Sequence, residues 1–382
     1  MKNICLLGAT GSIGQSTLDI IKANQDKYCL KAFSFCHNIN KAREIIQEFS
    51  PVLVASPIKE HLEKLKEEFT NINFSSDINE VAVYECDNPC VINALVASAG
   101  LIPTIKTIEA RRDVLLANKE SLVMAGELVM EKAKEMNVKI IPIDSEHSAI
   151  FQLLNEQNQK DINKIIITAS GGALYNKTID ELALVTVENA LNHPTWKMGA
   201  KITIDSATMV NKAYEVIEAY HLFNLRVDQI DTIIHPESII HSMVEFNDYS
   251  IFAQMGVSDM RIPIQYALNY PSHVNNLVSK PLDLTNITLN FKPMDKSRFE
   301  IMDVVYDVLK KGKFYPVVFN ASNEVLVNQF LNGKITFDKI VKGIIKEINR
   351  TEELYGTLPY NLDNILKVDQ MVKERLTKEI IK

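Results

Sequence analysis

One segment of the chain places acidic groups where a cation could bind. Ile141-Pro142-Ile143-Asp144-Ser145-Glu146-His147-Ser148 runs from apolar residues into two carboxylates one residue apart. On a continuous strand, Asp144 and Glu146 would point to the same face, because side chains alternate with a period of two. If the chain turns into a helix after Asp144, both carboxylates can still converge at the edge of the strand. Either geometry allows a cation site without requiring one.

A second segment, Asp205-Ser206-Ala207-Thr208-Met209-Val210-Asn211-Lys212-Ala213-Tyr214-Glu215, adds a third carboxylate. We predict a strand at Ile202–Asp205 followed by a helix, which would place three polar groups on one face, because residues three and four apart are neighbours: Asn211, Lys212 and Glu215. Ser206, at the N-terminal end of that helix, could bind an anion with free backbone amides. The alternative is a solvated Lys–Glu pair. Three carboxylates and substrate oxygens would suit Mg²⁺ or Mn²⁺.

A glycine-rich run, Gly8-Ala9-Thr10-Gly11-Ser12-Ile13-Gly14, follows a predicted strand and opens a predicted helix. In that context glycines permit a tight turn and a close backbone approach, and the helix N-terminus faces a pyrophosphate; the alternative is a merely structural turn. The second strand ends at Ser34-Phe35-Cys36-His37-Asn38, without the acid usual in NAD-preferring folds. This absence, with Lys41 and Arg43 close behind, favours NADP.

Four further segments carry weaker signals. Asn118-Lys119-Glu120-Ser121 follows an apolar strand pattern, where ligands sit in parallel sheets, but it also fits a helix N-cap. Ser170-Gly171-Gly172 is an amide-rich turn that could bind phosphate. His193–Gly199 contains the only tryptophan, Trp196, and predicts either a lid or a loop anchored to the core. His235 and His241 are six residues apart, which does not place them on one helix face, so we interpret them as structural.

Strand and helix patterns alternate over the first part of the chain, which is typical of a parallel sheet with crossover helices. The predicted strands are Asn3–Leu7, Leu30–Phe35, Val52–Ala55, Val91–Ala94, Asp113–Leu116 and Lys139–Ile143, and the predicted helices are Ser12–Ala23, Lys41–Phe49 and Lys59–Phe69. They predict a dinucleotide-binding domain over residues 1–145.

The second part of the chain predicts a different organisation. Residues 146–275 form a predicted catalytic domain with strands at Lys164–Ala169, Ile202–Asp205, Gln229–Ile234 and Ser250–Gln254. Residues 276–296, which include Pro281 and Pro293, read as a linker. From residue 297 to 382 the apolar spacing becomes helical.

Composition limits the class of protein. The 382 residues are 46% hydrophobic and 23% charged, which is ordinary for a folded globular protein. A formal net charge of −7 argues against nucleic acid as a partner. Five cysteines without C-x-x-C spacing fit a reducing compartment. No signal or membrane-span pattern is present, so we expect a cytoplasmic enzyme that does not bind membranes, or an organellar one of plastid type if a targeting peptide has been removed.

Taken in this order and spacing, the motifs make the sequence resemble the 1-deoxy-D-xylulose 5-phosphate reductoisomerase family over nearly the whole chain. The match also includes His193-Pro194-x-Trp196-x-Met198-Gly199, His235-Pro236, His241-Ser242-Met243-Val244 and Asn320-Ala321-Ser322-Asn323-Glu324. The resemblance implies an α/β protein with a Rossmann-like N-terminal domain, an α+β catalytic domain that makes the dimer contact, and a C-terminal helical domain. It further implies a homodimer that converts its phosphosugar with NADPH and Mg²⁺ or Mn²⁺ to 2-C-methyl-D-erythritol 4-phosphate, in the methylerythritol phosphate route to isoprenoid precursors.

The resemblance also implies site residues. The cofactor would contact Thr10, Gly11, Ser12, Ile13, Asn38, Asn118, Glu120 and Gly199, and His37 could act near the 2′-phosphate. The metal would be held by Asp144, Glu146 and Glu215. The substrate would be bound by Lys119, Ser145, Glu146, Ser170, His193, Trp196, Ser206, Asn211, Lys212 and Glu215, with Trp196 on a flexible flap. Lys119, Glu146 and Glu215 would be catalytic.

The chain departs from the family at two places. Ala173-Leu174-Tyr175 stands where many members have Pro-Phe-Arg, and Cys36-His37 stands where Gly and a basic residue are usual. Two other functions compete with the reductoisomerase reading. A semialdehyde-type dehydrogenase needs a catalytic cysteine, but none follows Cys90. A nucleotide-sensing protein without catalysis would be expected to lack the metal ligands, yet all three carboxylates are present.

Overall fold

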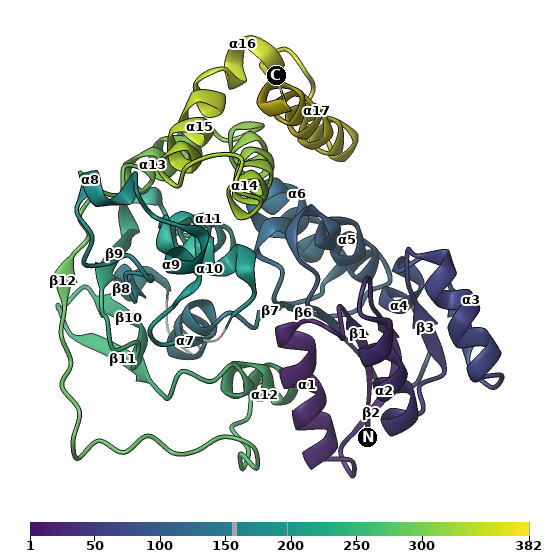
Figure 1. Cartoon of the computed structure of the whole chain (residues 1–382). Helices are drawn as coiled ribbons and strands as arrows, with labels where there is room; N and C mark the ends of the chain where they lie inside the picture. Colours follow the sequence, from purple (N-terminus) through teal and green to yellow (C-terminus); the bar gives the residue numbers. More distant parts are fainter. Residues whose placement is uncertain (155–158, 197, 382) are drawn as a thin grey trace. The chain divides into compact units, whose positions relative to one another are not determined.

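A computed structural model describes residues 1–154, 159–196 and 198–381 and divides the chain into two compact units (Figure 1). Unit 1 consists of residues 1–121, 129–148 and 259–280, and unit 2 of residues 122–128, 149–258 and 281–382. Lys197 of the predicted flap lies outside the described residues.

Unit 1 is built on a parallel sheet with strand order β4-β3-β2-β1-β5-β6-β7. The strands are β1 (Lys2–Leu7), β2 (Tyr28–Ser34), β3 (Leu53–Ala55), β4 (Asn73–Ser75), β5 (Pro89–Asn93), β6 (Val114–Leu116) and β7 (Ile140–Pro142). The helices are α1 (Ser12–Ala23), α2 (Ile39–Phe49), α3 (Lys59–Glu68), α4 (Asn79–Ala82), α5 (Leu101–Glu109), α6 (Lys119–Met136) and α12 (Arg261–Asn269), and α7 (Ser145–Leu154) begins in this unit.

This architecture confirms the predicted parallel sheet, with β1 in the centre. Apart from β4, the strands are largely buried and mostly apolar, as expected where helices cover both faces. From β1 the order runs one way through β2 and the other way through β5, so the crevice between them is the topological switch point. The loop that leaves β1 is the glycine-rich run.

A segment from late in the chain completes unit 1. Helix α12 packs on α1 and β7. Tyr28 Oη donates a hydrogen bond to Asn269 Oδ1 at 2.8 Å, and Lys2 Nζ donates to the Leu268 carbonyl at 2.5 Å. These contacts tie residues 259–280 to the first two strands, a long-range pairing that local sequence patterns do not reveal.

Unit 2 contains a mixed sheet with strand order β11-β10-β8-β9-β12. The strands are β8 (Ile162–Ala169), β9 (Ile230–Ile234), β10 (Ile240–Phe246), β11 (Ile251–Met255) and β12 (Lys292–Pro293). Strands β8 and β9 are parallel, and the other pairs are antiparallel. The predicted strands that became β8, β9 and β11 are confirmed, whereas β10 was not among the predicted strands. Between β8 and β9 the chain forms the helices α8 (Ile179–Leu182), α9 (Val187–Leu191), α10 (Ala200–Ala207) and α11 (Val210–Phe223).

The predicted strand at Ile202–Asp205 is wrong, because these residues lie in α10. Three apolar or β-branched residues in a row suggested a strand, but the buried positions Thr203, Ile204 and Ala207 follow helical spacing. Lys201 also pairs with Asp205 at 2.7 Å, four residues on, which only a helix permits. Ser206 therefore lies in the last turn of α10 and not at the start of α11.

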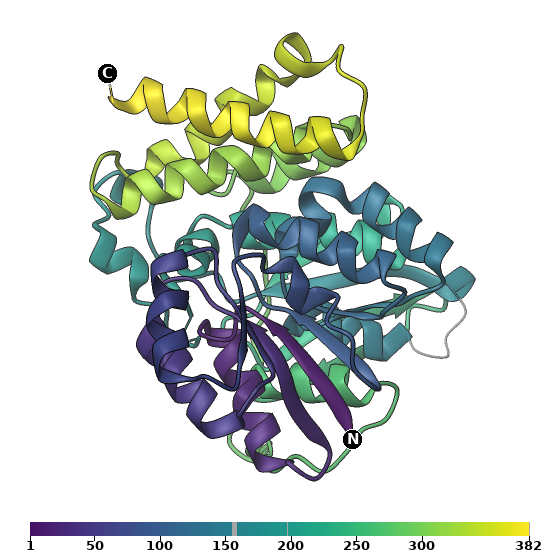
Figure 2. The ribbon, with the colours of Figure 1, turned by 90° about the vertical axis from the view of Figure 1, so that its right-hand side faces the viewer.

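The C-terminal part of unit 2 is helical, as predicted: α13 (Ile301–Lys311), α14 (Tyr315–Leu331), α15 (Asp338–Asn349), α16 (Thr351–Tyr355) and α17 (Leu362–Ile381). Helix α14 packs against α15 and α17 and also contacts α10, and Figure 2 shows these C-terminal helices side by side. One continuous apolar core joins α13, α14 and α15 to β8 and α11. Among the described residues, no helix combines the length and apolar composition needed to cross a bilayer.

Candidate active site

The glycine-rich loop has the backbone geometry of a nucleotide cradle. Gly8 has φ +85°, and a Cβ there would lie 2.6 Å from the Ala94 carbonyl oxygen beyond β5. A Cβ on Gly14 would lie 2.4 Å from the Gly8 carbonyl oxygen, so position 14, in the first turn of α1, must also be glycine. Thr10 and Ile13 are half-buried, whereas Gly11 and Ser12 are exposed at the start of α1. The loop thus presents backbone amides at the switch point, where a pyrophosphate would fit.

The segment after β2 is open and carries no acid. His37 is exposed, and Asn38 caps α2 by accepting a hydrogen bond from the Lys41 amide at 3.0 Å. Arg43 donates to Glu68 at 2.5 and 2.7 Å, so its guanidinium is already paired. A histidine that sequence reasoning missed lies here: the His61 ring stacks on Phe35, with ring centroids 6.1 Å apart. Only the contact between α3 and the end of β2 reveals it.

Asn118 holds the start of α6. Its Oδ1 accepts hydrogen bonds from the Ser121 amide and hydroxyl, which is an N-cap, and its Nδ2 donates to the carbonyls of Leu95 and Ala97. A Cβ on Gly100 would lie 2.2 Å from Asn118 Cγ, so the side chain is tightly enclosed. The helix-cap reading of this segment is confirmed, and the cofactor contact of Asn118 and Glu120 stays a prediction.

Asp144 lies at the centre of a buried charge cluster. Lys119 Nζ pairs with its carboxylate, and His147 Nδ1 lies 3.0 Å from Asp144 Oδ1. Burial would raise the pKa of the Asp144 carboxyl, but the Lys119 ammonium and the His147 ring outweigh it and hold that pKa well below its usual range. His147 is fully buried against this carboxylate. It therefore orients Asp144, a role that the sequence alone left open.

The chain turns into a helix directly after Asp144, which decides between the two geometries that the sequence left open. Glu146 lies in the first turn of α7, and its amide donates to Asp144 Oδ1 at 3.2 Å. The Ser145 hydroxyl donates to Glu146 Oε2 at 2.5 Å. The half-buried carboxylates of Asp144 and Glu146 thus lie around one helix N-terminus, where the dipole favours negative charge.

In unit 2, α11 gathers the predicted polar triad on one face. Glu215 is 1% exposed; Lys212 Nζ pairs with its carboxylate, and Asn211 Nδ2 donates to Glu215 Oε1 at 2.6 Å. Because both members of the pair are buried, the solvated Lys–Glu pair is excluded. The helix begins after Met209, which has φ +64°.

The turn after β8 and the loop before α10 meet at Ser170. His193 Nδ1 accepts hydrogen bonds from the Thr195 and Trp196 amides, and His193 Nε2 lies 3.1 Å from Ser170 Oγ. Burial lowers the pKa of His193, which favours the neutral ring. Because Nδ1 accepts from two backbone amides, Nε2 carries the hydrogen and donates a hydrogen bond to Ser170 Oγ. The half-buried Trp196 ring lies 6.2 Å from the His241 ring.

The same turn lies directly against Ser206. Gly172 has φ +70°, and a Cβ there would lie 2.7 Å from the Ser206 carbonyl oxygen. The structure therefore brings Ser170, His193 and Ser206 together. Gly199, predicted to contact the cofactor, precedes α10, and a Cβ there would meet no atom of the described residues within 4 Å.

The departure at Ala173-Leu174-Tyr175 has a structural consequence. Where many family members carry arginine, the Tyr175 ring packs under Gly171. Arg298, from the segment before α13, reaches the same place: its Nη1 donates to the Tyr175 carbonyl at 2.6 Å, and its guanidinium lies 5.8 Å from the Tyr175 ring centre. Sequence reasoning missed Arg298 because 123 residues separate it from its partner.

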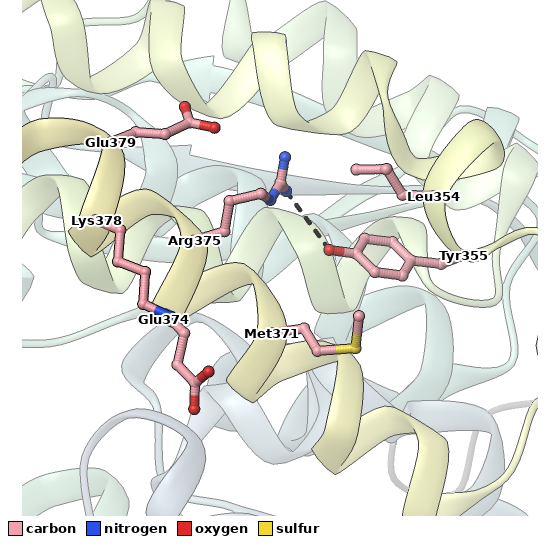
Figure 3. Close-up of a pocket in the computed structure, with 7 residues that line it drawn as sticks. All are labelled: Leu354, Tyr355, Met371, Glu374, Arg375, Lys378 and Glu379. Atoms are coloured by element: carbon pink, nitrogen blue, oxygen red, sulfur yellow. Dashed lines mark hydrogen bonds between the residues drawn. The ribbon is translucent and has the colours of Figure 1, made fainter.

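Of the two histidines interpreted as structural, His235 shapes a turn. His235 is fully buried and its Nε2 accepts hydrogen bonds from the amides of Ile239 and Ile240, which shapes the turn into β10. Away from these groups, a cavity of about 470 Å³ lies between α16 and α17, where Arg375 donates to the Tyr355 hydroxyl (Figure 3). None of the predicted site residues lines it.

Comparisons with known proteins agree along the chain. Three family models match: 1-deoxy-D-xylulose 5-phosphate reductoisomerase over residues 4–126, its C-terminal domain over 140–223, and the DXP reductoisomerase C-terminal domain over 255–375. The chain is similar to 1-deoxy-D-xylulose 5-phosphate reductoisomerase 2 of Bacillus anthracis, with 48% identity over all of both chains. It is 50% identical to the Bacillus subtilis (strain 168) enzyme over 93% of this chain and 94% of that one.

Solved structures are also similar. A DOX-P reductoisomerase crystallised with NADPH, fosmidomycin and magnesium superposes with a TM-score of 0.93 at 36% identity, covering 100% of this chain and 98% of that one. The Zymomonas mobilis enzyme in complex with NADPH gives 0.90 at 35% identity, covering 99% of both chains.

Proposed function

Because this chain belongs to the 1-deoxy-D-xylulose 5-phosphate reductoisomerase family, we propose how its own residues divide the work of that reaction. The enzyme is an NADPH-dependent reductoisomerase of the non-mevalonate route to isoprenoid precursors. It rearranges 1-deoxy-D-xylulose 5-phosphate and reduces the product to 2-C-methyl-D-erythritol 4-phosphate, with a divalent metal. Full-length identity of 48% to named enzymes carries this conclusion.

The proposed cofactor site draws mainly on unit 1. The Gly8 and Gly14 geometry supports a pyrophosphate on the loop, and the acid-free end of β2 supports a 2′-phosphate nearby. We assign the cofactor contacts to Thr10, Gly11, Ser12, Ile13, His37, Asn38, Asn118 and Glu120, together with Gly199 of unit 2. Lys41 and Arg43 are paired with Glu44 and Glu68, so we assign the exposed His37 as a basic group facing the 2′-phosphate.

The metal ligands in this proposal are Asp144 and Glu146 of unit 1 and Glu215 of unit 2. Carboxylate oxygens are the donors that Mg²⁺ and Mn²⁺ prefer, and the depressed pKa keeps Asp144 ionised. His147 orients Asp144, and Asn211 orients Glu215. When bound, the cation acts as a Lewis acid that stabilises negative charge on substrate oxygens.

The substrate phosphate is assigned to unit 2. Ser170, Ser206, Asn211 and Lys212 supply hydroxyl, amide and ammonium donors, and His193 holds Ser170 in place. Trp196, three residues after His193, would cover the substrate and exclude water. On the unit 1 side, Ser145 would contact the substrate, and Lys119 would hold or move a proton at Nζ next to Asp144.

Metal-dependent turnover tests this proposal. NADPH oxidation with 1-deoxy-D-xylulose 5-phosphate should require Mg²⁺ or Mn²⁺ after chelation. Glu146→Gln should lower kcat/KM by about a hundredfold or more, with the NADPH dissociation constant unchanged, because the nucleotide loop does not involve Glu146. Glu131→Gln, which changes an exposed carboxylate on α6, is the control and should retain full activity. Metal-independent turnover, or equal loss of activity and NADPH binding, would refute the assignment.

The oligomeric state extends the proposal. Strand β11 lies at the edge of its sheet and pairs, within the described residues, with β10 alone. Ile251, Phe252 and Met255 on this strand are 49%, 50% and 37% exposed. An edge strand that exposes apolar side chains on both faces is prone to pair with another chain. A second copy of this chain, related by a twofold axis, would cover both patches at once, which supports a homodimer.

The dimer has a direct test in solution. Phe252→Glu should shift the mass measured by light scattering from two chains toward one, because a carboxylate would be buried at the interface. Met371→Glu, which changes an exposed methionine on α17, should leave the mass unchanged. A monomeric wild type would overturn this part of the proposal.

We place the enzyme in the cytoplasm, supported by its five free cysteines.

A further inference from the structure

Two asparagines of α14 contact the two helices that carry the proposed phosphate ligands. Asn320 and Asn323 are fully buried and lie three residues apart on one helix face. Asn323 Nδ2 donates to Asp205 Oδ1 at 2.8 Å, and Asp205 immediately precedes Ser206 on α10. Tyr214 Oη donates to Asn320 Oδ1 at 3.0 Å, and Tyr214 immediately precedes Glu215 on α11.

The contacts form a closed arrangement around Asp205. This carboxylate is 2% exposed and also accepts from Lys201 Nζ at 2.7 Å. Lys201 lies over the Tyr214 ring, 5.5 Å from its centre. Helices α10 and α11 are therefore joined to each other through Lys201 and Tyr214, and each is joined separately to α14.

Helix α14 is also held by a contact with α17. Asn320 Nδ2 donates to Glu324 Oε1 at 2.9 Å, and Glu324 pairs with Lys373 of α17 at 2.6 Å. Lys373 pairs with Asp369 of the same helix at 2.9 Å. Buried hydrogen bonds to charged groups are strong and directional in a low dielectric, so this chain of contacts fixes the position of α14 relative to its neighbours.

We propose that Asn320 and Asn323 are positioning residues for substrate phosphate binding. They hold α10 and α11 at the spacing that Ser206, Asn211 and Lys212 need to bind one phosphate. The inference rests on the proposed function of those three residues. It gives the Asn320-x-x-Asn323-Glu324 motif a role that neither sequence reasoning nor the site itself supplies.

Steady-state kinetics and direct binding test it. Asn323→Ala and Asn320→Ala should each raise KM for 1-deoxy-D-xylulose 5-phosphate about tenfold and weaken inorganic phosphate binding, measured by calorimetry, by a similar factor. kcat should change less than about twofold and NADPH affinity should not change, because the nucleotide loop lies in unit 1. Asn328→Ala, an exposed asparagine on the same helix, is the matched control and should behave as wild type.

A swapped pair separates positioning from general stability. Asn323→Asp places a second carboxylate against Asp205 and should raise KM further than Asn323→Ala does. Asp205→Asn combined with Asn323→Asp restores one donor and one acceptor, and it should recover part of the phosphate affinity. Val305→Ala, in the core at α13, should lower Tm without changing KM.

Two outcomes would overturn the inference. If the α14 variants lower Tm but leave KM and phosphate affinity at wild-type values, the asparagines only stabilise the fold. If phosphate and NADPH affinities fall together, the effect is global. Phosphate binding is measured without turnover, so a wild type that binds phosphate but shows no reductoisomerase activity would contradict the proposed function and not this inference.

Discussion

At the scale of single residues, each unit contains one enclosed ammonium–carboxylate pair within its proposed site. Lys119 pairs with Asp144 in unit 1, and Lys212 pairs with Glu215 in unit 2. Such pairs are expensive to desolvate and are weak contributors to stability. The proposed function would explain their presence, because a site for a dication and a phosphate needs ionised groups held away from water.

Breaking one of these pairs has a predictable cost. Lys212→Met should lower the free energy of unfolding by about 3 kcal/mol, because the buried Glu215 carboxylate loses its Lys212 ammonium partner. Combining it with Glu215→Gln should recover most of that loss. Urea denaturation followed by circular dichroism measures both values. Lys177→Met, which breaks the half-exposed pair with Glu181, should cost less than about 1 kcal/mol; equal effects at both sites would contradict the burial argument.

At the scale of elements, the site groups stand at the ends of strands and helices. The nucleotide loop follows β1, Asn118 follows β6, and Asp144 follows β7. The carboxyl ends of parallel strands lie at the same edge of a sheet, so these groups lie at one edge although they are far apart in the sequence. In unit 2 the turn after β8 plays the same part for Ser170.

The glycine-rich loop tests this dependence on backbone geometry. Gly8→Ala should destabilise the cofactor-free protein by about 1–3 kcal/mol. The alanine would have to adopt φ +85°, and its Cβ would lie 2.6 Å from the Ala94 carbonyl oxygen. Gly11 has φ −80°, and a Cβ there would lie 3.4 Å from the Gly8 oxygen. Gly11→Ala should therefore change Tm little. Thermal unfolding without NADPH separates the two; a matching drop in both would rule out this account of the loop.

At the scale of the whole molecule, the site residues divide between the units by ligand. Nearly all proposed cofactor contacts belong to unit 1, the proposed phosphate contacts belong to unit 2, and the proposed metal ligands belong to both units. In this assignment the nucleotide loop and the phosphate ligands belong to different units, so each ligand can be bound by the residues of one unit.

Hydrogen exchange should reveal the division. NADPH alone should slow exchange at residues 8–14 and 34–38, because binding protects the amides that it contacts and stabilises the surrounding unit. Inorganic phosphate alone should slow exchange at residues 170–172 and 206–212. Mass spectrometry of peptides from both segments gives the comparison in one experiment. Protection by phosphate confined to unit 1 would contradict the assignment.

The sequence alone determined the class of fold, the strands β1, β2, β3, β5, β6 and β7, the helices α1, α2 and α3, and the glycine loop, whereas β4, α4, α5 and α6 were not predicted. Period-two and period-3.6 patterns are local, and glycine, asparagine and acidic residues carry their constraints with them. Asn211, Lys212 and Glu215 were predicted to share a face because helical spacing is enough to place them.

Only the tertiary structure decided the rest. It showed that Ile202–Asp205 is helical, that α12 belongs to unit 1, and that Asn323 supports Asp205 from a helix 118 residues further along the chain. The physical reason is common to all three. β-branched runs satisfy either helix or strand until packing selects one, and contacts between distant segments depend on burial and hydrogen-bond complementarity that no local pattern encodes.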